Sequence, residues 1–237
     1  MHRDDLKMSQ TKPPERRFEV FADFDGTITT RDTLDVIMKE LADPSYFVLE
    51  EQWVRGEIGS HACLERQVPL LRGGWPAMVE MLTEMRIDPT FPDFAVWLKD
   101  LAVPLRVVSD GIDKIILHML ERAGLMQNGL IEAVVSNCLQ VQDDGRLSIE
   151  FPNSRAEAGC WSGTCKCFAL GKGAAEPAKS LCVVIGDGLS DRCWAKNADI
   201  LFAKGRLLHY CRENQIPCHP FQDFRDVRAG LEKLFDL

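Results

Sequence analysis

Two aspartates, Asp23 and Asp25, flank a phenylalanine directly after an apolar stretch of the chain. Gly26 and Thr27 follow at once, so the chain can turn sharply there and present backbone N–H groups and a hydroxyl to an anion. Carboxylates this close repel each other, and a hard divalent cation bound through oxygen atoms relieves that repulsion. The segment therefore predicts acid–base chemistry beside a metal ion, and Mg²⁺ is the ion we expect.

Two further polar turns occur later in the chain. One contains Ser109, Asp110 and Gly111, and the other contains Asp187 and Asp191. The first offers hydrogen-bond donors, whereas the second adds two carboxylates to those of the first segment. A site that combines acidic ligands, a cation and a ring of donors suits a phosphate group.

Each polar turn follows a stretch that predicts a buried strand. Apolar runs predict strands at 17–23, 104–109 and 181–185, and a hairpin between 134 and 147. From residue 46 to about residue 101 only helical signals occur. This alternation predicts an α/β fold, a doubly wound parallel sheet with an all-helical cap inserted after its first unit. Ligands bind at the carboxyl ends of such strands, so the three turns should converge.

The chain length fits one domain that carries a smaller inserted one. Residues 1–17 are polar and charged, and we interpret them as a flexible N-terminal tail. Residues 18–34 and 102–237 are expected to form the catalytic core, and residues 35–101 the helical cap.

A phosphate dianion beside several carboxylates also needs a fixed positive charge. Lys166 and Lys172 both lie between the predicted hairpin and the strand at 181–185. Lys166 is preferred, because it follows Gly163 and Thr164, which would place it on the first turn of a helix. Lys172 is the alternative.

These motifs resemble those of the haloacid dehalogenase superfamily of phosphohydrolases. The segment 23–27, Asp-Phe-Asp-Gly-Thr, resembles the first signature of that superfamily. Ser109 resembles its second motif, Lys166 its third and the segment 186–191 its fourth. The helical insertion after the first motif is similar to that of the C1-capped branch, which includes phosphoserine phosphatase, and implies a Rossmann-like core.

A finer resemblance rests on scattered residues of the insertion and of the stretch before Lys166. Trp53, Gly56, the region of Gln67 and a cysteine-rich stretch are most similar to the methionine-salvage 2-hydroxy-3-keto-5-methylthiopentenyl-1-phosphate phosphatases.

The resemblance implies a role for each acidic residue. Asp23 would be the nucleophile that forms a phosphoaspartyl intermediate, and Asp25 would protonate the leaving group and then deprotonate water. Asp23, the backbone carbonyl of Asp25, and Asp187 would hold Mg²⁺, with Asp191 as a direct or water-mediated ligand. Asp32, which can cap the helix after the first turn, would face the cap and contact substrate or gate closure.

The resemblance also implies which groups bind the phosphoryl oxygens. Electrostatic positioning of this kind is most of what phosphoryl transfer asks of a protein. The expected substrate-binding and phosphate-binding residues are Gly26, Thr27, Ser109, Asp110, Gly111 and Lys166.

Nine cysteines do not make this chain a disulfide scaffold, because their number is odd and the chain is too long to need staples. We expect a reducing, cytoplasmic location. Cys160, Cys165 and Cys167 form a cluster that would suit zinc, although free thiols packed near the rim of the site are favoured.

The formal charge of −8, from 28 basic and 36 acidic residues, argues against binding to nucleic acid or to an anionic membrane. No run of about 18 apolar residues predicts a transmembrane helix, and the polar N-terminus is not a secretory signal. The expected partner is a small phosphorylated metabolite, bound by a monomer or a homodimer.

The cap is expected to set the specificity of the site. Arg55, Arg66 and Arg72 would receive a substrate carboxylate or would be exposed helix charges, and Trp53 belongs to an apolar part of the insertion. The leading prediction is a Mg²⁺-dependent phosphomonoesterase that acts through a phosphoaspartyl intermediate. Phosphoserine phosphatase, a phosphotransferase and a non-catalytic binding protein on the same fold are the alternatives.

Overall fold

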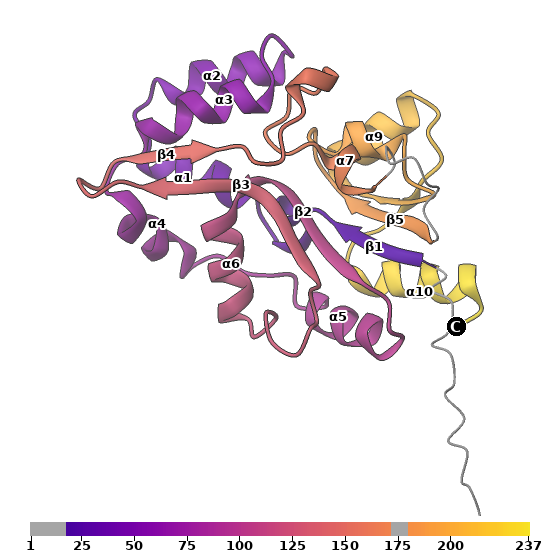
Figure 1. Cartoon of the computed structure of the whole chain (residues 1–237). Helices are drawn as coiled ribbons and strands as arrows, with labels where there is room; N and C mark the ends of the chain where they lie inside the picture. The colour runs from indigo at the N-terminus through magenta and orange to yellow at the C-terminus, as the bar shows by residue number, and fades with distance from the viewer. Residues whose placement is uncertain (1–17, 172–179) are drawn as a thin grey trace, which may run out of the picture.

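The computed structural model describes residues 18–171 and 180–237, and the predicted tail at 1–17 and Lys172 lie outside these ranges. In the described chain, seven strands form one sheet in the order β4-β3-β2-β1-β5-β6-β7 (Figure 1). All neighbouring pairs are parallel except β3 and β4, which form an antiparallel hairpin. The strands are β1 (Phe18–Ala22), β2 (Leu105–Ile112), β3 (Ala133–Val141), β4 (Leu147–Glu150), β5 (Leu181–Gly186), β6 (Ile200–Ala203) and β7 (His219–Pro220).

Helices cover both faces of this sheet. Successive side chains of the inner strands therefore point alternately into two buried clusters. Val20 and Ala22 belong to one cluster, with residues of α5, α6 and α10, whereas Phe21 belongs to the other, with residues of α8 and α9. The predicted doubly wound fold is confirmed. The helices are α1 (Thr33–Leu41), α2 (Tyr46–Val54), α3 (Ser60–Gln67), α4 (Gly74–Leu82), α5 (Phe91–Asp100), α6 (Asp113–Arg122), α7 (Lys166–Ala169), α8 (Arg192–Ala195), α9 (Gly205–Glu213) and α10 (Phe224–Phe235).

The predicted insertion between β1 and β2 is helical, and it contains α1, α2, α3, α4 and α5. Asp32 caps α1 as expected, since its carboxylate accepts a hydrogen bond of 2.9 Å from the backbone N–H of Asp35. In Figure 1, α2 and α3 lie over the β3–β4 hairpin. Helix α5 instead packs beside β2 and α10, where the ring of Phe91 lies 4.8 Å from that of Phe224. The boundaries of the cap, residues 35–101, stay a prediction. Helix α5 lies within that range, but it contacts the core.

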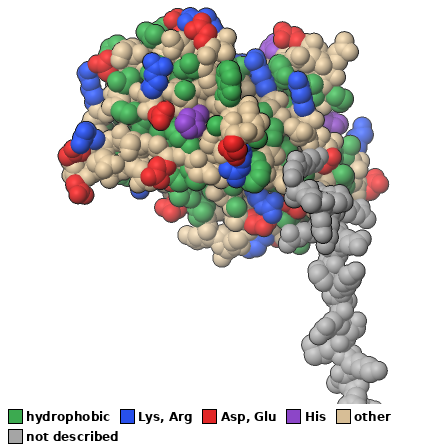
Figure 2. All heavy atoms as spheres, turned by 45° about the horizontal axis from the view of Figure 1, so that its top comes forward, with side chains coloured by type: hydrophobic (Ala, Val, Ile, Leu, Met, Phe, Trp, Pro, Cys, Tyr) green, Lys and Arg blue, Asp and Glu red, His purple; other side chains and the backbone are tan. Residues whose placement is uncertain are grey.

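The surface carries both signs of charge. On the face shown in Figure 2, acidic and basic side chains are interspersed rather than separated by sign. Every helix in the described chain is too short or too polar to span a bilayer. The expected absence of nucleic-acid and membrane partners stays a prediction.

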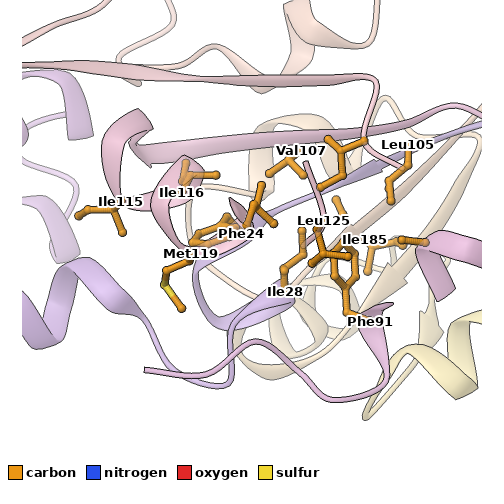
Figure 3. Packing of buried hydrophobic residues seen from close by; sticks show 14 of the residues in the cluster. Phe24, Ile28, Phe91, Leu105, Val107, Ile115, Ile116, Met119, Leu125 and Ile185 are labelled. Atoms are coloured by element: carbon orange, nitrogen blue, oxygen red, sulfur yellow. The ribbon is translucent and has the colours of Figure 1, made fainter. Parts of the chain in front are cut away.

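Two apolar side chains anchor the turn that follows β1. Phe24 and Ile28, at the two ends of the one-turn segment η1 (Phe24–Ile28), are fully buried. Figure 3 shows both packed in a cluster with Val107 of β2 and Met119 of α6. A movement of the segment between Phe24 and Ile28 would expose both side chains to water. The core therefore fixes the position of the adjacent aspartates.

Candidate active site

Asp23 occupies the position directly after β1, where the first and fifth strands meet. Its backbone N–H donates to the carbonyl of Ile185 on β5 at 2.9 Å, and its Oδ1 accepts from the N–H of Phe24 at 2.8 Å. Gly26 follows with φ of +72°, and a Cβ there would lie 2.5 Å from Oδ2 of Asp187. Glycine is therefore required both by the turn and by the approach of a second carboxylate.

Lys166 lies between two carboxylates in the interior of the site. Its Nζ is 2.7 Å from Oδ1 of Asp23 and 2.7 Å from Oδ1 of Asp191, and it lies 4.8 Å from the ring centroid of Trp194. Burial opposes its charge, yet Asp191 and Asp23 raise the pKa of Lys166 above its ordinary value. The lysine is the first residue of α7, as predicted.

The carboxylates of Asp23, Asp187 and Asp191 each offer an oxygen within 4.8 Å of the others. Both oxygens of Asp191 already have partners, because Oδ2 accepts from the N–H groups of Asp187 and Gly188 at 2.9 Å and Oδ1 pairs with Lys166. Oδ1 of Asp187 accepts from the hydroxyl of Thr27 at 2.7 Å. In this arrangement the hydroxyl of Thr27, a predicted phosphate ligand, donates its hydrogen bond to the carboxylate of Asp187.

This acidic group carries more negative charge than Lys166 balances. Burial raises the pKa of Asp23, and Asp191 and Asp187 raise it further, although Lys166 opposes them. Burial and Asp191 raise the pKa of Asp187 to about 6. Carboxylate oxygens at this spacing are the ligands of a hard divalent cation, which would relieve the excess charge, so the donor set fits Mg²⁺.

Asp25 has surroundings that differ from those of Asp23. Its Oδ1 accepts from the backbone N–H of Thr33 at 2.8 Å and also from the Thr33 hydroxyl. A Cβ on Gly111 would lie 2.7 Å from Oδ2, so only glycine fits beside that oxygen. Burial, with a further contribution from Asp32, raises the pKa of Asp25 to about 7. Near neutral pH this group can therefore both donate and accept a proton.

The last part of β2 contributes Ser109 and Asp110, because the strand continues to Ile112 rather than ending at residue 109 as predicted, and its register with β3 shifts between Val108 and Ile112. The hydroxyl oxygen of Ser109 accepts from the N–H of Gly111 at 3.0 Å. The carboxylate of Asp110 accepts from the backbone N–H of Thr164 at 2.8 Å and from the hydroxyl of Ser60. Asp110 thus lies beside the phosphate-binding elements with its side chain engaged by protein groups.

A pocket of about 530 Å³ opens over these residues, between the strand ends and the cap. The expected residues Asp23, Asp25, Ser109 and Asp187 line its floor, and the exposed Asp32 lies at its edge. Its walls come from α1, α2, α3, the loop between β5 and α8, and α9. The wall residues are Leu34, Asp35, Met38, Lys39, Tyr46, Phe47, Glu50, Trp53, Val54, Ser60, Cys63, Leu64, Gln67, Leu189, Ser190 and Arg206.

The three arginines considered for carboxylate recognition do not line this pocket. Arg55 pairs with Glu57 at 2.7 Å, and Arg72 approaches Asp43 at 2.5 Å. Arg66 is exposed on α3. Trp53, by contrast, does line the pocket.

The cysteine cluster holds free thiols. Cys160, Cys165 and Cys167 are unpaired by disulfides, and Cys165 is buried. Within the residues that the structure describes, the acidic group formed by Asp23, Asp187 and Asp191 is the one whose ligand atoms gather closely enough to hold an ion. The zinc alternative gains no support from the structure.

Four polar residues that contact the predicted site were not predicted from the sequence. Thr33 donates a hydrogen bond to Asp25. Asp110 accepts hydrogen bonds from Ser60, Asn137 and Thr164. Asn137 carried a weak signal, because an amide within a predicted strand requires hydrogen-bond partners when it is buried, and the structure shows it fully buried. Ser60 lies on a helix of the insertion, and its contact becomes visible only in three dimensions.

The fold and the acidic pocket at its strand ends define a hydrolase that transfers phosphoryl groups. The family model of the haloacid dehalogenase-like hydrolases matches residues 20–196, and the chain belongs to that family. The expectation derived from the motifs is confirmed.

Relatives with curated names extend this finding. A 2-hydroxy-3-keto-5-methylthiopentenyl-1-phosphate phosphatase of Geobacillus kaustophilus (strain HTA426) is 32% identical over 225 residues, which cover 92% of this chain and 97% of the relative. Pdp3-interacting factor 1 of Schizosaccharomyces pombe (strain 972 / ATCC 24843) is 30% identical, over 93% of this chain and 97% of the relative. The relatives named as phosphatases support a phosphoric monoester hydrolase.

Solved structures share the fold at lower identity. A substrate-bound phosphoserine phosphatase complex superposes with a TM-score of 0.67 at 21% identity, covering 90% of this chain and 98% of the other. A phosphoaspartyl-intermediate analogue of phosphoserine phosphatase has a TM-score of 0.64 at 20% identity, with the same coverage. These likenesses confirm the doubly wound core.

Proposed function

We propose that this chain is a Mg²⁺-dependent phosphomonoesterase that hydrolyses a small phosphorylated metabolite with an uncharged, partly apolar body. The observation that carries the proposal is the different surroundings of two aspartates one residue apart. Burial raises the pKa of both carboxyls, but Asp23 pairs with the buried Lys166 at 2.7 Å, which lowers its pKa, whereas Asp25 accepts from Thr33 and has a pKa of about 7. Such a difference supports separate roles as nucleophile and as acid–base group.

In the first step, a carboxylate oxygen of Asp23 attacks phosphorus, and the bond between phosphorus and the substrate oxygen breaks. Asp25 gives its proton to the leaving oxygen. In the second step, Asp25 takes a proton from water, the water oxygen attacks phosphorus, and the bond to Asp23 breaks to release inorganic phosphate. Lys166, Ser109 and the backbone beside it hold the phosphoryl oxygens.

Asp23, Asp187 and the backbone carbonyl of Asp25 would hold Mg²⁺, and Asp191 would orient the site through Lys166 and the N–H groups of Asp187 and Gly188. When bound, the ion supplies positive charge to the transferring phosphoryl group and orients it. The excess of buried carboxylates over cations supports this assignment.

The cap wall supports an apolar body on the substrate. Met38, Tyr46, Trp53 and Val54 face the pocket, and the three cap arginines lie elsewhere. The charged groups on the wall already have partners within it, because Lys39 pairs with Asp35 at 2.7 Å and Glu50 accepts from Gln67 at 3.2 Å and lies in the field of Arg206. A phosphoserine carboxylate and ammonium would have to compete with these partners. The bacterial relatives are named for a keto-phosphate with a methylthio group, and a compound of this class suits the wall.

The test is phosphate release from a panel of phosphorylated metabolites with Mg²⁺, with EDTA, and with Asp23→Asn. The panel contains ketose 1-phosphates, a methylthio-substituted keto-phosphate, phosphoserine, sugar phosphates and nucleotides. We expect turnover that EDTA and Asp23→Asn both abolish, with the methylthio compound preferred. A preference for phosphoserine would overturn the substrate class, and turnover by Asp23→Asn would overturn the mechanism.

A further inference from the structure

Asp110 joins three parts of the molecule through one buried carboxylate. It follows Ser109 in the irregular last part of β2, and the residue is 9% exposed. Oδ1 accepts from the backbone N–H of Thr164 at 2.8 Å, two residues before Lys166. Oδ2 accepts from the hydroxyl of Ser60, the first residue of α3 in the cap.

Asn137 of β3 fixes the core side of this arrangement. It is fully buried, and its Nδ2 donates to the backbone carbonyl of Asp110 at 2.7 Å. Its Oδ1 accepts from the hydroxyl of Thr164 at 3.0 Å. A Cβ on Gly163 would lie 2.8 Å from that Oδ1, so the loop approaches as closely as glycine allows.

The start of α3 rests on the same loop that leads to Lys166. The backbone N–H of His61 donates to the carbonyl of Trp161 at 3.2 Å, and the His61 ring lies 3.9 Å from that of Phe151. A Cβ on Gly59 would lie 2.0 Å from the Trp161 carbonyl oxygen. The cap helix and the lysine loop are therefore in direct contact.

A buried carboxylate is stable only while donors satisfy it. Burial raises the pKa of Asp110, and the hydrogen bonds from Ser60 and from Thr164 lower it again. One of these donors belongs to the core loop and the other to the cap. Oδ2 keeps the hydroxyl of Ser60 as a partner only while the start of α3 stays packed against the loop that leads to Lys166. We call this position of α3 seated.

We propose that Asp110 is a positioning residue that couples the seating of cap helix α3 to the placement of Lys166. The proposal rests on the proposed phosphatase function. Asp110 acts through Thr164 on one side and through Ser60 on the other, rather than on the phosphoryl group. A substrate whose body fills the cap side of the pocket stabilises the seated helix, and a small aryl phosphate does not use it.

The first test compares kcat and KM of four variants on para-nitrophenyl phosphate and on the best cap-filling metabolite. Ser60→Ala is expected to lower kcat/KM about tenfold more for the cap-filling substrate than for the aryl phosphate, since about tenfold is the contribution of one charge-assisted hydrogen bond. Asp110→Ala is expected to lower kcat at least about tenfold on both substrates, because Thr164 then loses its acceptor.

Two further variants separate positioning from folding. Asp110→Asn keeps an acceptor for the N–H of Thr164 and can donate from its amide to the Ser60 hydroxyl oxygen, so it should retain more turnover than Asp110→Ala on both substrates. Ser45→Ala is the matched control, because the Ser45 hydroxyl donates to Asp43 at 2.8 Å at an exposed start of α2, and it should match the wild type.

Amide hydrogen exchange supplies a readout that needs no activity. Exchange at Thr164 should become faster in Asp110→Ala, and exchange at His61 faster in Ser60→Ala, with the wild-type rate in Ser45→Ala. The proposal is overturned if Ser60→Ala affects both substrates equally, or if Asp110→Ala keeps the wild-type kcat and exchange. If the wild type hydrolyses no phosphate, the proposed function fails, and the exchange rates still decide whether Asp110 couples the two elements.

Discussion

The floor and the cap wall of the pocket are built on different principles. Beneath the floor, Lys166 and Asp191 are fully buried, and hydrogen bonds or ion pairs of 2.7–2.9 Å connect them to Asp23, Asp187 and Gly188. On the wall, Phe47 and Val54 are 54% and 50% exposed and contribute apolar surface. The difference supports the proposal that the core fixes the chemistry, whereas the cap selects the substrate body through weaker contacts.

The packing beneath each region explains this difference. The floor residues follow strands whose side chains belong to two buried clusters, one on each face of the sheet. Helix α2 of the cap has a single buried residue, Leu49, within its described span. A helix anchored so lightly can shift without disturbing the core.

The largest effect should come from removing the nucleophile on the floor. Asp23→Asn is expected to lower kcat by at least about 10⁴-fold, because the amide cannot form the phosphoaspartyl intermediate. Asp35→Asn, which changes a carboxylate on the cap wall, is the matched control and should retain most of the activity. Steady-state kinetics with circular dichroism checks both, and equal losses in the two variants would erase the contrast between floor and wall.

The second effect concerns the buried cation. Lys166→Met leaves Asp23 and Asp191 without their shared partner, so kcat should fall about 100-fold or more, and the free energy of unfolding should fall by about 3 kcal/mol. Urea unfolding and kinetics measure the two losses. Lys172→Met, the alternative considered from the sequence, should behave like the wild type, and the reverse result would reassign the phosphate-binding lysine.

The third effect is a dependence of stability on pH in the metal-free protein. The pKa is about 7 for Asp25 and about 6 for Asp187 in the folded chain, against 3.8 in the unfolded chain. The folded state therefore binds more protons, and this contribution to stability, complete below about pH 4, is lost as the pH rises through 6 to 7. Thermal unfolding with EDTA should show a Tm lower by a few degrees at about pH 8 than at about pH 5.

Mg²⁺ should reverse that loss, because it binds the ionised carboxylates of the folded state. Its stabilising effect should be larger at the higher pH. A Tm that is independent of pH, or a Mg²⁺ effect that is equal at both values, would contradict the charge imbalance proposed for the floor.

The smallest effect should come from the wall. Trp53→Ala removes an apolar surface from the pocket and should raise KM about tenfold for the preferred apolar substrate, with little change in kcat. Para-nitrophenyl phosphate should be hydrolysed as by the wild type. Trp97→Ala, which changes a tryptophan of α5 outside the pocket, is the comparison, and a loss of kcat on both substrates in Trp53→Ala would mean that the wall also positions the chemistry.

Much of the fold followed from local sequence patterns. The strands that lead to the three turns are apolar runs that end in aspartate and glycine, and these were predicted to within a few residues. The two-residue strand β7 (His219–Pro220) had no pattern long enough to predict. Helix α8 begins directly after Asp191, whose carboxylate accepts from the N–H groups of Asp187 and Gly188, a contact that no sequence pattern predicted.

The candidate site was less completely predictable. The spacing of the aspartates at the strand ends predicts their role. The residues just before Lys166 favour it as the phosphate-binding lysine. The side-chain partners were not accessible, since Ser60 reaches Asp110 across 50 residues and Thr27 reaches Asp187 across 160. Such contacts depend on how the cap and the sheet close, which no local pattern contains.

The measurement that tests the central assignment most directly is the trapping of the phosphorylated enzyme. The Asp25→Asn variant is mixed with Mg²⁺ and para-nitrophenyl phosphate, a substrate whose leaving group needs no protonation. The reaction is then quenched in acid. Peptide mass spectrometry should find one phosphoryl group on Asp23, since hydrolysis of that intermediate lacks its base. A phosphoryl group on another residue, or rapid turnover with no covalent species, would contradict the account.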